Sequence, residues 1–343
     1  MTSSAPVPVA LSLGGNSGNV PEALARAAAL LTGGGFRIER VSSAIRTSPV
    51  DCPPGTPDFL NQAITGFWRG APEELLDLTQ SIEVRLGRPD RHGFHTPRTL
   101  DIDIVAFGRL RMRSERLFLP HPEAAKRAFV LEPLDEIAPE WRAFLTADDP
   151  ADAERILDFH YPEDTPLKRL LLTHSRQVRD KALAILDKHP ELRIDRRFAA
   201  EAAMLHDLGI GRCHAPGIFC TGSAPYLAHG LLGAEMLRGY GARIGADLDA
   251  LANVCERHTG AGITAEEVRS QALPIPARDY LPGSPGEKLI CYADKFFSKS
   301  GDLREKSLER VRRSLAKFGA DSLARFDAMD RMFGLEKTEE KKE

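Results

Sequence analysis

The chain has 343 residues, more than one hydrophobic core usually organises, so two domains are expected. Its 42% hydrophobic and 28% charged residues are typical of a soluble globular protein, and a formal net charge of −3 argues against a strongly basic nucleic-acid-binding protein. Because it shows neither a secretory signal nor an apolar run of roughly 20 residues, and its five cysteines form no Cys-x-x-Cys pair, we expect a cytoplasmic protein with reduced thiols and no membrane span.

The first elements of the chain are a strand and a helix. Residues 7–13 alternate apolar and small side chains, which predicts a strand. After the loop GGNSGN, Asn19 can cap a helix that has Pro21 in its first turn and Glu22 three residues after the cap. Three consecutive glycines from Gly33 end that helix.

Two more strands, a helix and a fourth strand follow. Residues 36–44 and 60–68 read as strands, Pro72 opens an amphipathic helix, and residues 100–107 form another strand. The order strand–helix–strand–strand–helix–strand is that of an α+β ferredoxin-like sandwich. We assign it to a domain over residues 1–144.

The second half is predicted to be all-α. Residues 145–165 are acidic and lose apolar periodicity, so we interpret them as a linker before a helical domain over 166–334. The charged tail 335–343 lacks apolar residues and is expected to be disordered. The predicted helices span 167–188, 197–206, 227–239, 247–257, 286–298 and 303–333.

The strongest motif of the first half is PRTLDID. Asp101 and Asp103 lie two apart in a predicted strand and therefore point to the same face. That spacing suits two hard cations. The surrounding arginines could neutralise and orient a polyphosphate; they are Arg88, Arg91, Arg98, Arg116 and Arg127. Taken alone, the pair could instead be exposed acids that protect a sheet edge from aggregation.

A second constellation favours the cation site. The stretch TSPVDCPPGTPDFLN joins a rigid loop to a strand that begins with an aromatic residue and an amide, Phe59 and Asn61. A flat heterocycle with donor and acceptor edges would require such a pair.

Residues 7–142 resemble the 6-hydroxymethyl-7,8-dihydropterin pyrophosphokinase family. The matching stretches include LSLGGN, SSAIRTSPV, PDFLNQAI, PEELLDLTQSIEVRLGR, PRTLDIDIVAFG and ERLFLPHPEAAKRAFVLEPLDEIAPEW. The resemblance implies a ferredoxin-like fold, ATP as donor, a pterin alcohol as acceptor and two Mg²⁺ ions. The pterin oxygen would attack the β-phosphorus of ATP and expel AMP.

The resemblance also implies residue roles. Asp101 and Asp103 would hold both Mg²⁺ ions, and Arg88 and Arg98 would join them in catalysis. The pterin slot would consist of Thr47, Ser48, Val50, Phe59, Asn61 and Phe129. The ATP contacts would be Gln80, Glu83, Arg98, Arg116, His121 and Arg127. One departure is His95, which stands where many family members carry an aromatic residue before PRT, so closure of that loop is an open question.

The second half carries histidines and aspartates in an ordered series. The contexts are THSRQV, MLHDLGIG, LAHGLLG, ERHTGAGI and YADKF. A lone helical histidine is usually a core residue, but a series on amphipathic helices indicates a shared ion. The series consists of His174, His206, Asp207, His229, His258 and Asp294.

This series resembles the HD phosphohydrolase superfamily over roughly residues 164–334. By that resemblance His174, His206, Asp207 and Asp294 hold one metal ion, and Asp207 bridges to a second held by His229 and His258. Imidazole and carboxylate ligands suit a divalent transition metal, with Fe or Mn favoured. An activated water would then attack a phosphoester.

Two hypotheses for this second half stay open. It hydrolyses a phosphoester, such as a pterin or nucleotide phosphate, or it is a regulatory metal- and nucleotide-binding module without turnover. The sequence indicates no nucleic-acid or membrane partner, and it leaves the oligomeric state and the coupling between the two halves undecided.

Overall fold

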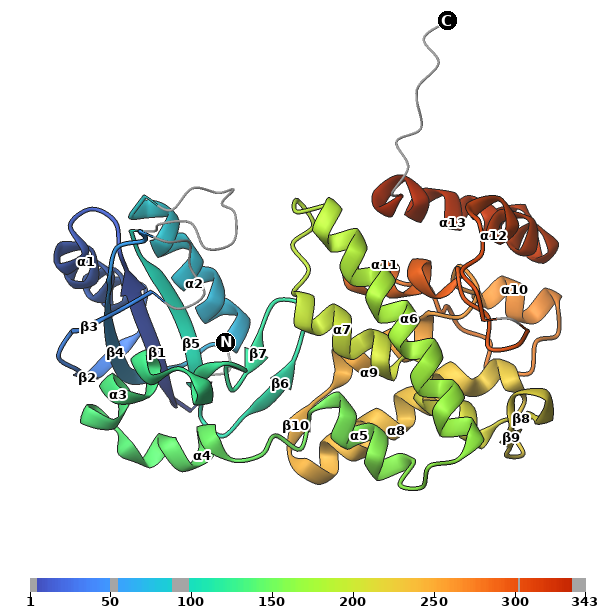
Figure 1. The fold of residues 1–343 in the computed structure, drawn as a ribbon, viewed down its shortest axis with the longest axis horizontal. Coiled ribbons are helices and arrows are strands. Elements are labelled where there is room, and N and C mark those ends of the chain that lie inside the picture. Colours follow the sequence, from blue (N-terminus) through green and yellow to red (C-terminus); the bar gives the residue numbers. More distant parts are fainter. Residues whose placement is uncertain (1–4, 50–54, 88–98, 302, 335–343) are drawn as a thin grey trace, which may run out of the picture. The chain divides into compact units, whose positions relative to one another are not determined.

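The computed structural model describes residues 5–49, 55–87, 99–301 and 303–334 (Figure 1). The chain divides into two compact units. The first comprises residues 1–112 and 117–148, and the second comprises residues 113–116 and 149–343. Each unit is described by itself below.

The first unit is built on an antiparallel sheet. Its strands are β1 (Val7–Gly15), β2 (Arg37–Val41), β3 (Ile45–Thr47), β4 (Phe59–Trp68) and β5 (Asp101–Phe107). The spatial order is β2-β4-β1-β5, and β3 also pairs with β4. With helices α1 (Val20–Gly33) and α2 (Pro72–Arg85) in the two crossovers, this is the predicted ferredoxin-like arrangement.

One face of the sheet packs against α1 and α2. The Asn19 side chain accepts from the backbone N–H of Glu22 and begins α1 as predicted. The buried side chains between helices and sheet include Leu11, Ile64 and Ile104. Burying these aliphatic side chains anchors every long strand, because each contributes roughly 1.5–3 kcal/mol relative to exposure.

The other face is only partly covered. Helix α3 (Ala128–Ile137) packs against β4, and with α4 (Arg142–Thr146) it buries a second apolar cluster that includes Ala63, Val105 and Leu134. Two short strands, β6 (Arg111–Arg113) and β7 (Phe118–Leu119), lie between β5 and α3 in the sequence, and they pair with each other.

The second unit is dominated by helices, as predicted (Figure 1). They are α5 (Ala153–His160), α6 (Pro166–Lys188), α7 (Arg196–Leu205), α8 (His229–Ile244), α9 (Asp249–Arg257), α10 (Ala265–Ser270), α11 (Pro285–Asp294), α12 (Leu308–Leu315) and α13 (Ala320–Phe333). Their contacts centre on α6, α7, α8, α9 and α11, which pack against one another.

Several details of this unit differ from the prediction. A two-stranded hairpin, β8 (His214–Ala215) with β9 (Cys220–Thr221), interrupts the helices, and a further short strand is β10 (Ala246–Asp247). The single helix expected over residues 303–333 is two helices, because Gly319 adopts φ +112° between them. The segment 145–165 contains α5, whose buried Ile156 and Leu157 were too few to give a periodic signal.

Two candidate active sites

The sheet register brings the chemically important residues of the first unit together. Gly14 of β1 pairs with Asn61 of β4 on one side and with Asp101 of β5 on the other. Residues directly opposite in an antiparallel sheet share a face, so Asn61 and Asp101 project from the same surface. Asp103 lies on that surface as well, since Ile102 and Ile104, which alternate with the two aspartates, are buried in the core under α1 and α2.

The predicted pterin residues of β3 and β4 line the same surface. Thr47 pairs with Phe59, which lies two residues before Asn61. The Asn61 side chain is buried, and its amide donates to Thr47 Oγ1 over 2.8 Å. Ser48 is exposed directly after β3.

Gly14 is a residue whose importance the sequence prediction missed. A Cβ built on Gly14 would lie 2.5 Å from Asn61 Oδ1. The absence of a side chain therefore lets the Asn61 amide lie over β1, toward Asp101. The motif LSLGGN contains the signal, but only the pairing across three strands shows which glycine is needed.

Helix α3 and the segment that precedes it supply the remaining predicted residues of this face. Phe129 is half-buried and packs against the apolar cluster under α3, and the Arg127 guanidinium lies 5.6 Å from the centre of its ring. His121 is half-buried, its backbone N–H donates to Val105 O, and its Nδ1 accepts from the Glu123 N–H over 3.2 Å.

The predicted ATP contacts on α2 lie beside β5, at the end of the sheet order. Gln80 is exposed, whereas Glu83 is buried and accepts from the Ile102 backbone N–H over 2.7 Å. Arg116 belongs to the segment 113–116 that groups with the second unit. The predicted roles of Val50, Arg88 and Arg98, and the question of His95, fall outside the described residues.

All six predicted metal ligands of the second unit converge. His174 lies within α6, His206 and Asp207 follow α7, His229 begins α8, His258 follows α9, and Asp294 ends α11. None of these side chains is more than 8% exposed. Five separate helices thus direct polar groups into one buried centre.

One half of this centre joins His174, His206, Asp207 and Asp294. The Nε2 atoms of the two histidines lie 3.3 Å apart, and each lies 3.3 Å from Asp207 Oδ2. Asp294 Oδ1 lies 2.9 Å from His174 Nε2 and 3.5 Å from His206 Nε2.

The other half joins His229 and His258 to the second oxygen of Asp207. The Nε2 atoms of these histidines lie 3.0 Å apart, and each lies 3.4 Å from Asp207 Oδ1. Asp207 therefore faces one histidine pair with each carboxylate oxygen; its role as a bridge between two ions stays a prediction.

The donor set fits divalent transition metals. Ligands about 2.1 Å from an ion are separated by about 3.0–3.4 Å in octahedral and tetrahedral shells, which matches the spacings above. The Nδ1 atoms of His206, His229 and His258 donate to the carbonyl oxygens of Ala203, Tyr226 and Cys255, at 2.6–2.7 Å. These hydrogen bonds leave each Nε2 lone pair free for a metal.

Electrostatics favour the ligating forms of most of these groups. Burial, reinforced by the neighbouring His258, lowers the pKa of His229 to about 3. Burial opposes the charged form of Asp207, yet Lys299 and His206 hold the pKa of Asp207 well below its usual range. Burial also opposes the charged form of His206, but the Asp207 and Asp294 carboxylates outweigh it and raise its pKa to about 9. A metal ion would displace that proton.

Two lysines beside the centre were missed by the sequence prediction. Lys299 Nζ lies 2.7 Å from Asp207 Oδ2, and Lys295 Nζ lies 2.6 Å from Asp294 Oδ2. Both follow Asp294 closely in ADKFFSKS, but lysines after a helix are usually solvated, so spacing alone does not reveal their direction. Their side chains are only 14% and 12% exposed.

Comparisons with protein families assign the two halves separately. Residues 10–139 match the family described as 7,8-dihydro-6-hydroxymethylpterin-pyrophosphokinase, and residues 171–298 match the HD domain. Within the described part of the chain, no helix combines the length and the apolar character that crossing a membrane requires.

Relatives of the pyrophosphokinase half differ in how much of their own length the chain spans. A 2-amino-4-hydroxy-6-hydroxymethyldihydropteridine pyrophosphokinase of Bacillus subtilis is 42% identical over 131 residues, or 37% of this chain and 75% of that protein. One of Methylorubrum extorquens is 38% identical over 157 residues, or 43% of this chain and 96% of that protein. The chain spans only 23% of the mitochondrial folate synthesis bifunctional protein of Arabidopsis thaliana, to which it is 38% identical over 131 residues. The chain therefore belongs to the 7,8-dihydro-6-hydroxymethylpterin pyrophosphokinase family and joins that domain to a C-terminal HD domain.

Proposed function

We propose that the first unit transfers diphosphate from ATP to 6-hydroxymethyl-7,8-dihydropterin, giving AMP and the pterin diphosphate in folate biosynthesis. The observation that carries this proposal is the shared sheet face of Asn61, Asp101 and Asp103, set by the pairing of Gly14 with the two strands that flank β1. The names of the related pyrophosphokinases support the substrates.

The predicted site residues of the first unit have separable tasks. The Asn61 amide, oriented by Thr47, would hydrogen-bond the edge of the pterin, and Phe59 and Phe129 would stack on its ring. Two Mg²⁺ ions held by Asp101 and Asp103 would neutralise charge on the phosphates. Gln80, Glu83, His121 and Arg127 would position ATP, so that most of the catalysis is orientation and electrostatics.

Replacing Asp103 by alanine tests this proposal. We expect Asp103→Ala to reduce AMP formation with ATP, Mg²⁺ and hydroxymethyldihydropterin by about a hundredfold or more, because one cation loses a ligand. Asp135→Ala is the matched control, since Asp135 lies on α3 in an exposed ion pair with Arg142 that contributes little. Unchanged turnover of Asp103→Ala would refute the assignment.

We further propose that the second unit is a phosphohydrolase with a dinuclear centre, loaded with Fe or Mn. The observation that carries this proposal is the position of Asp207 between the two histidine pairs. The metals would supply Lewis acidity and an activated water for attack on phosphorus.

Four buried free cysteines among the described residues, Cys213, Cys220, Cys255 and Cys291, support a cytoplasmic location.

Metal content and phosphate release distinguish this hydrolase from a regulatory module. The full chain, reconstituted with Mn²⁺, is expected to hold about two ions and to release phosphate from members of a phosphoester panel. Asp207→Ala should lose both ions and all hydrolysis, whereas Asp249→Ala, in an exposed ion pair with Arg238, should lose neither. Two tightly bound ions without hydrolysis of any ester would favour the regulatory module.

A further inference from the structure

A cavity in the second unit reaches the metal centre. It has a volume of about 350 Å³. Its lining includes the ligand Asp294 and the residues Thr259 and Gly260, which directly follow the ligand His258. Cavities of a few hundred Å³ are typical of small-molecule sites.

The end of the cavity next to the centre is cationic. Its lining includes Lys295, Lys299 and Lys306. The three lysines outnumber the two carboxylates of the centre, Asp207 and Asp294, so this end carries an excess of positive charge before any metal binds. Divalent cations would increase that excess, so this end is suited to an anion such as a phosphoester.

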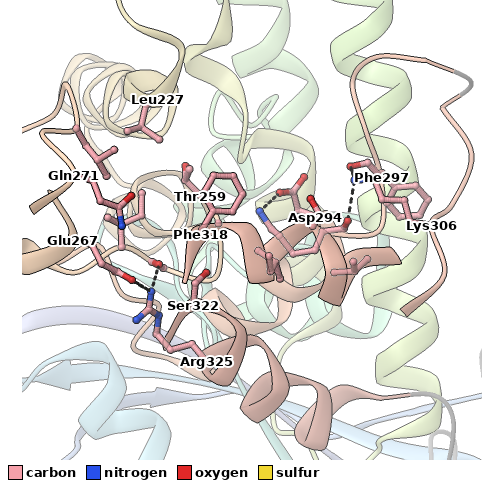
Figure 2. A pocket seen from close by; sticks show the side chains of 18 of the residues that line it. Leu227, Thr259, Glu267, Gln271, Asp294, Phe297, Lys306, Phe318, Ser322 and Arg325 are labelled. Atoms are coloured by element: carbon pink, nitrogen blue, oxygen red, sulfur yellow. Dashed lines mark hydrogen bonds and ion pairs between the residues drawn. The ribbon is translucent and has the colours of Figure 1, made fainter. Parts of the chain in front are cut away.

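The polar groups on the other side of the lining already pair with each other. Figure 2 shows Asp294 and Lys306 on one side and Glu267 and Arg325 on the other. Arg325 Nη2 lies 2.7 and 2.9 Å from the Glu267 carboxylate oxygens and 3.0 Å from the Gly262 carbonyl oxygen. The charges of Glu267 and Arg325 cancel each other, so this side of the cavity does not favour a charged ligand.

The remaining lining is mostly apolar, and it includes an exposed aromatic ring. Ile263, Leu273, Val311 and Leu315 contribute aliphatic surface, and Phe318 is 60% exposed. Val311, Leu315 and Phe318 lie beyond residue 298, where the HD match ends. When a flat ligand covers an exposed phenyl ring, burial of the apolar surface of the ring stabilises the complex.

We propose that the HD unit acts on small phosphoesters whose non-phosphate part is flat and largely apolar, with α12, Phe318 and α13 as the wall that selects it. This inference rests on the proposed phosphohydrolase function. The phosphate lies at the lysine-lined end, and the flat group lies against Phe318. Phe318 is a specificity-determining residue that does not touch the reacting atoms.

Binding of phosphonates, which are not hydrolysed, tests the selection without turnover. Calorimetry on the Mn²⁺-loaded full chain should show phenylphosphonate binding about tenfold tighter than methylphosphonate, as expected for stacking one ring. Phe318→Ala should reduce that ratio to about threefold or less, and Phe318→Trp should preserve it. Phe159→Ala is the control, because Phe159 is 45% exposed in the same unit but does not line this cavity.

Hydrolysis of the matching esters separates failure of this inference from failure of the proposed function. For phenyl phosphate, Phe318→Ala should raise KM with kcat nearly unchanged, and for methyl phosphate it should change neither. If hydrolysis depends on Asp207 but both phosphonates bind equally well, the proposed substrate class is wrong and the phosphohydrolase function stands. The same conclusion follows if hydrolysis depends on Asp207 but Phe318→Ala has no effect. Metal-loaded protein that neither binds a phosphonate nor hydrolyses an ester overturns the phosphohydrolase and this inference together.

Discussion

At the scale of single residues, Gly14 controls the orientation of Asn61. The Asn61 amide is held by Thr47 and lies against β1, where any larger residue than glycine would collide with its Oδ1. Gly14 needs no unusual backbone angle, since it is absent from the residues with positive φ. Its requirement is therefore one of space and not of conformation.

We expect Gly14→Ala to weaken pterin binding. The added methyl group would displace the Asn61 amide, and loss of one well-oriented hydrogen-bonding group costs about 1–3 kcal/mol, or roughly a tenfold rise in KM or more. KM for hydroxymethyldihydropterin and the thermal midpoint should be measured together. Gly33→Ala is the control because open space surrounds a Cβ at Gly33. A normal KM in Gly14→Ala would show that Asn61 does not position the pterin.

Asp207 is a second residue whose role was predicted only in part from the sequence. The His-Asp doublet and its ordered partners suggested a bridging carboxylate by resemblance. Which oxygen of Asp207 faces each histidine pair depends on histidines from other helices, and Lys299, which approaches the same carboxylate, comes from yet another segment. No local pattern encodes those directions.

At the scale of elements, β5 is held in place by α2. Its first four residues alternate between half-buried and buried, with the period of two that the sequence displays, and its remaining residues are all buried. Strand β5 lies at the end of the sheet order, and the buried Glu83 carboxylate accepts from the Ile102 N–H between the two aspartates. Glu83 thus contributes to the strand that carries Asp101 and Asp103, in addition to the ATP contact that we propose.

Two substitutions of Glu83 separate these roles. Glu83→Ala leaves the buried Ile102 N–H without this acceptor and should lower the free energy of unfolding by about 1–3 kcal/mol. Glu83→Gln keeps an acceptor oxygen and should retain most of that stability. Urea unfolding measures the stability, and KM for ATP measures the contact. If Glu83→Gln raises KM for ATP at near-normal stability, Glu83 contacts the nucleotide; if it leaves KM unchanged, the role of Glu83 is positioning.

The C-terminal helices illustrate the limits of periodicity at this scale. The pattern over residues 303–333 predicted one helix, and its helical character is confirmed, but Gly319 divides it into α12 and α13. This break places Phe318 at the end of a short helical turn, exposed beside the cavity. A glycine in a helical pattern is often tolerated, so the break was not evident from the sequence.

At the scale of the whole molecule, one chain joins two domains for which we propose different reactions. The family matches cover residues 10–139 and 171–298, and the described helices after residue 298 extend the second unit beyond its match. Both proposed reactions act on phosphorus, yet their centres use different ligands: carboxylates for Mg²⁺, and imidazoles with carboxylates for transition metals.

The sequence by itself determined the ferredoxin-like order of elements, the helical character of the second half and the residue types of both centres. These follow from periodicities and ordered motifs that are local in the chain. Only the tertiary structure decided that Gly14 makes room for Asn61, that each oxygen of Asp207 faces its own histidine pair, and that Phe318 borders a cavity beside Asp294. The physical reason is that such contacts join residues distant in sequence, and their geometry is set by packing and register, which side-chain spacing does not specify.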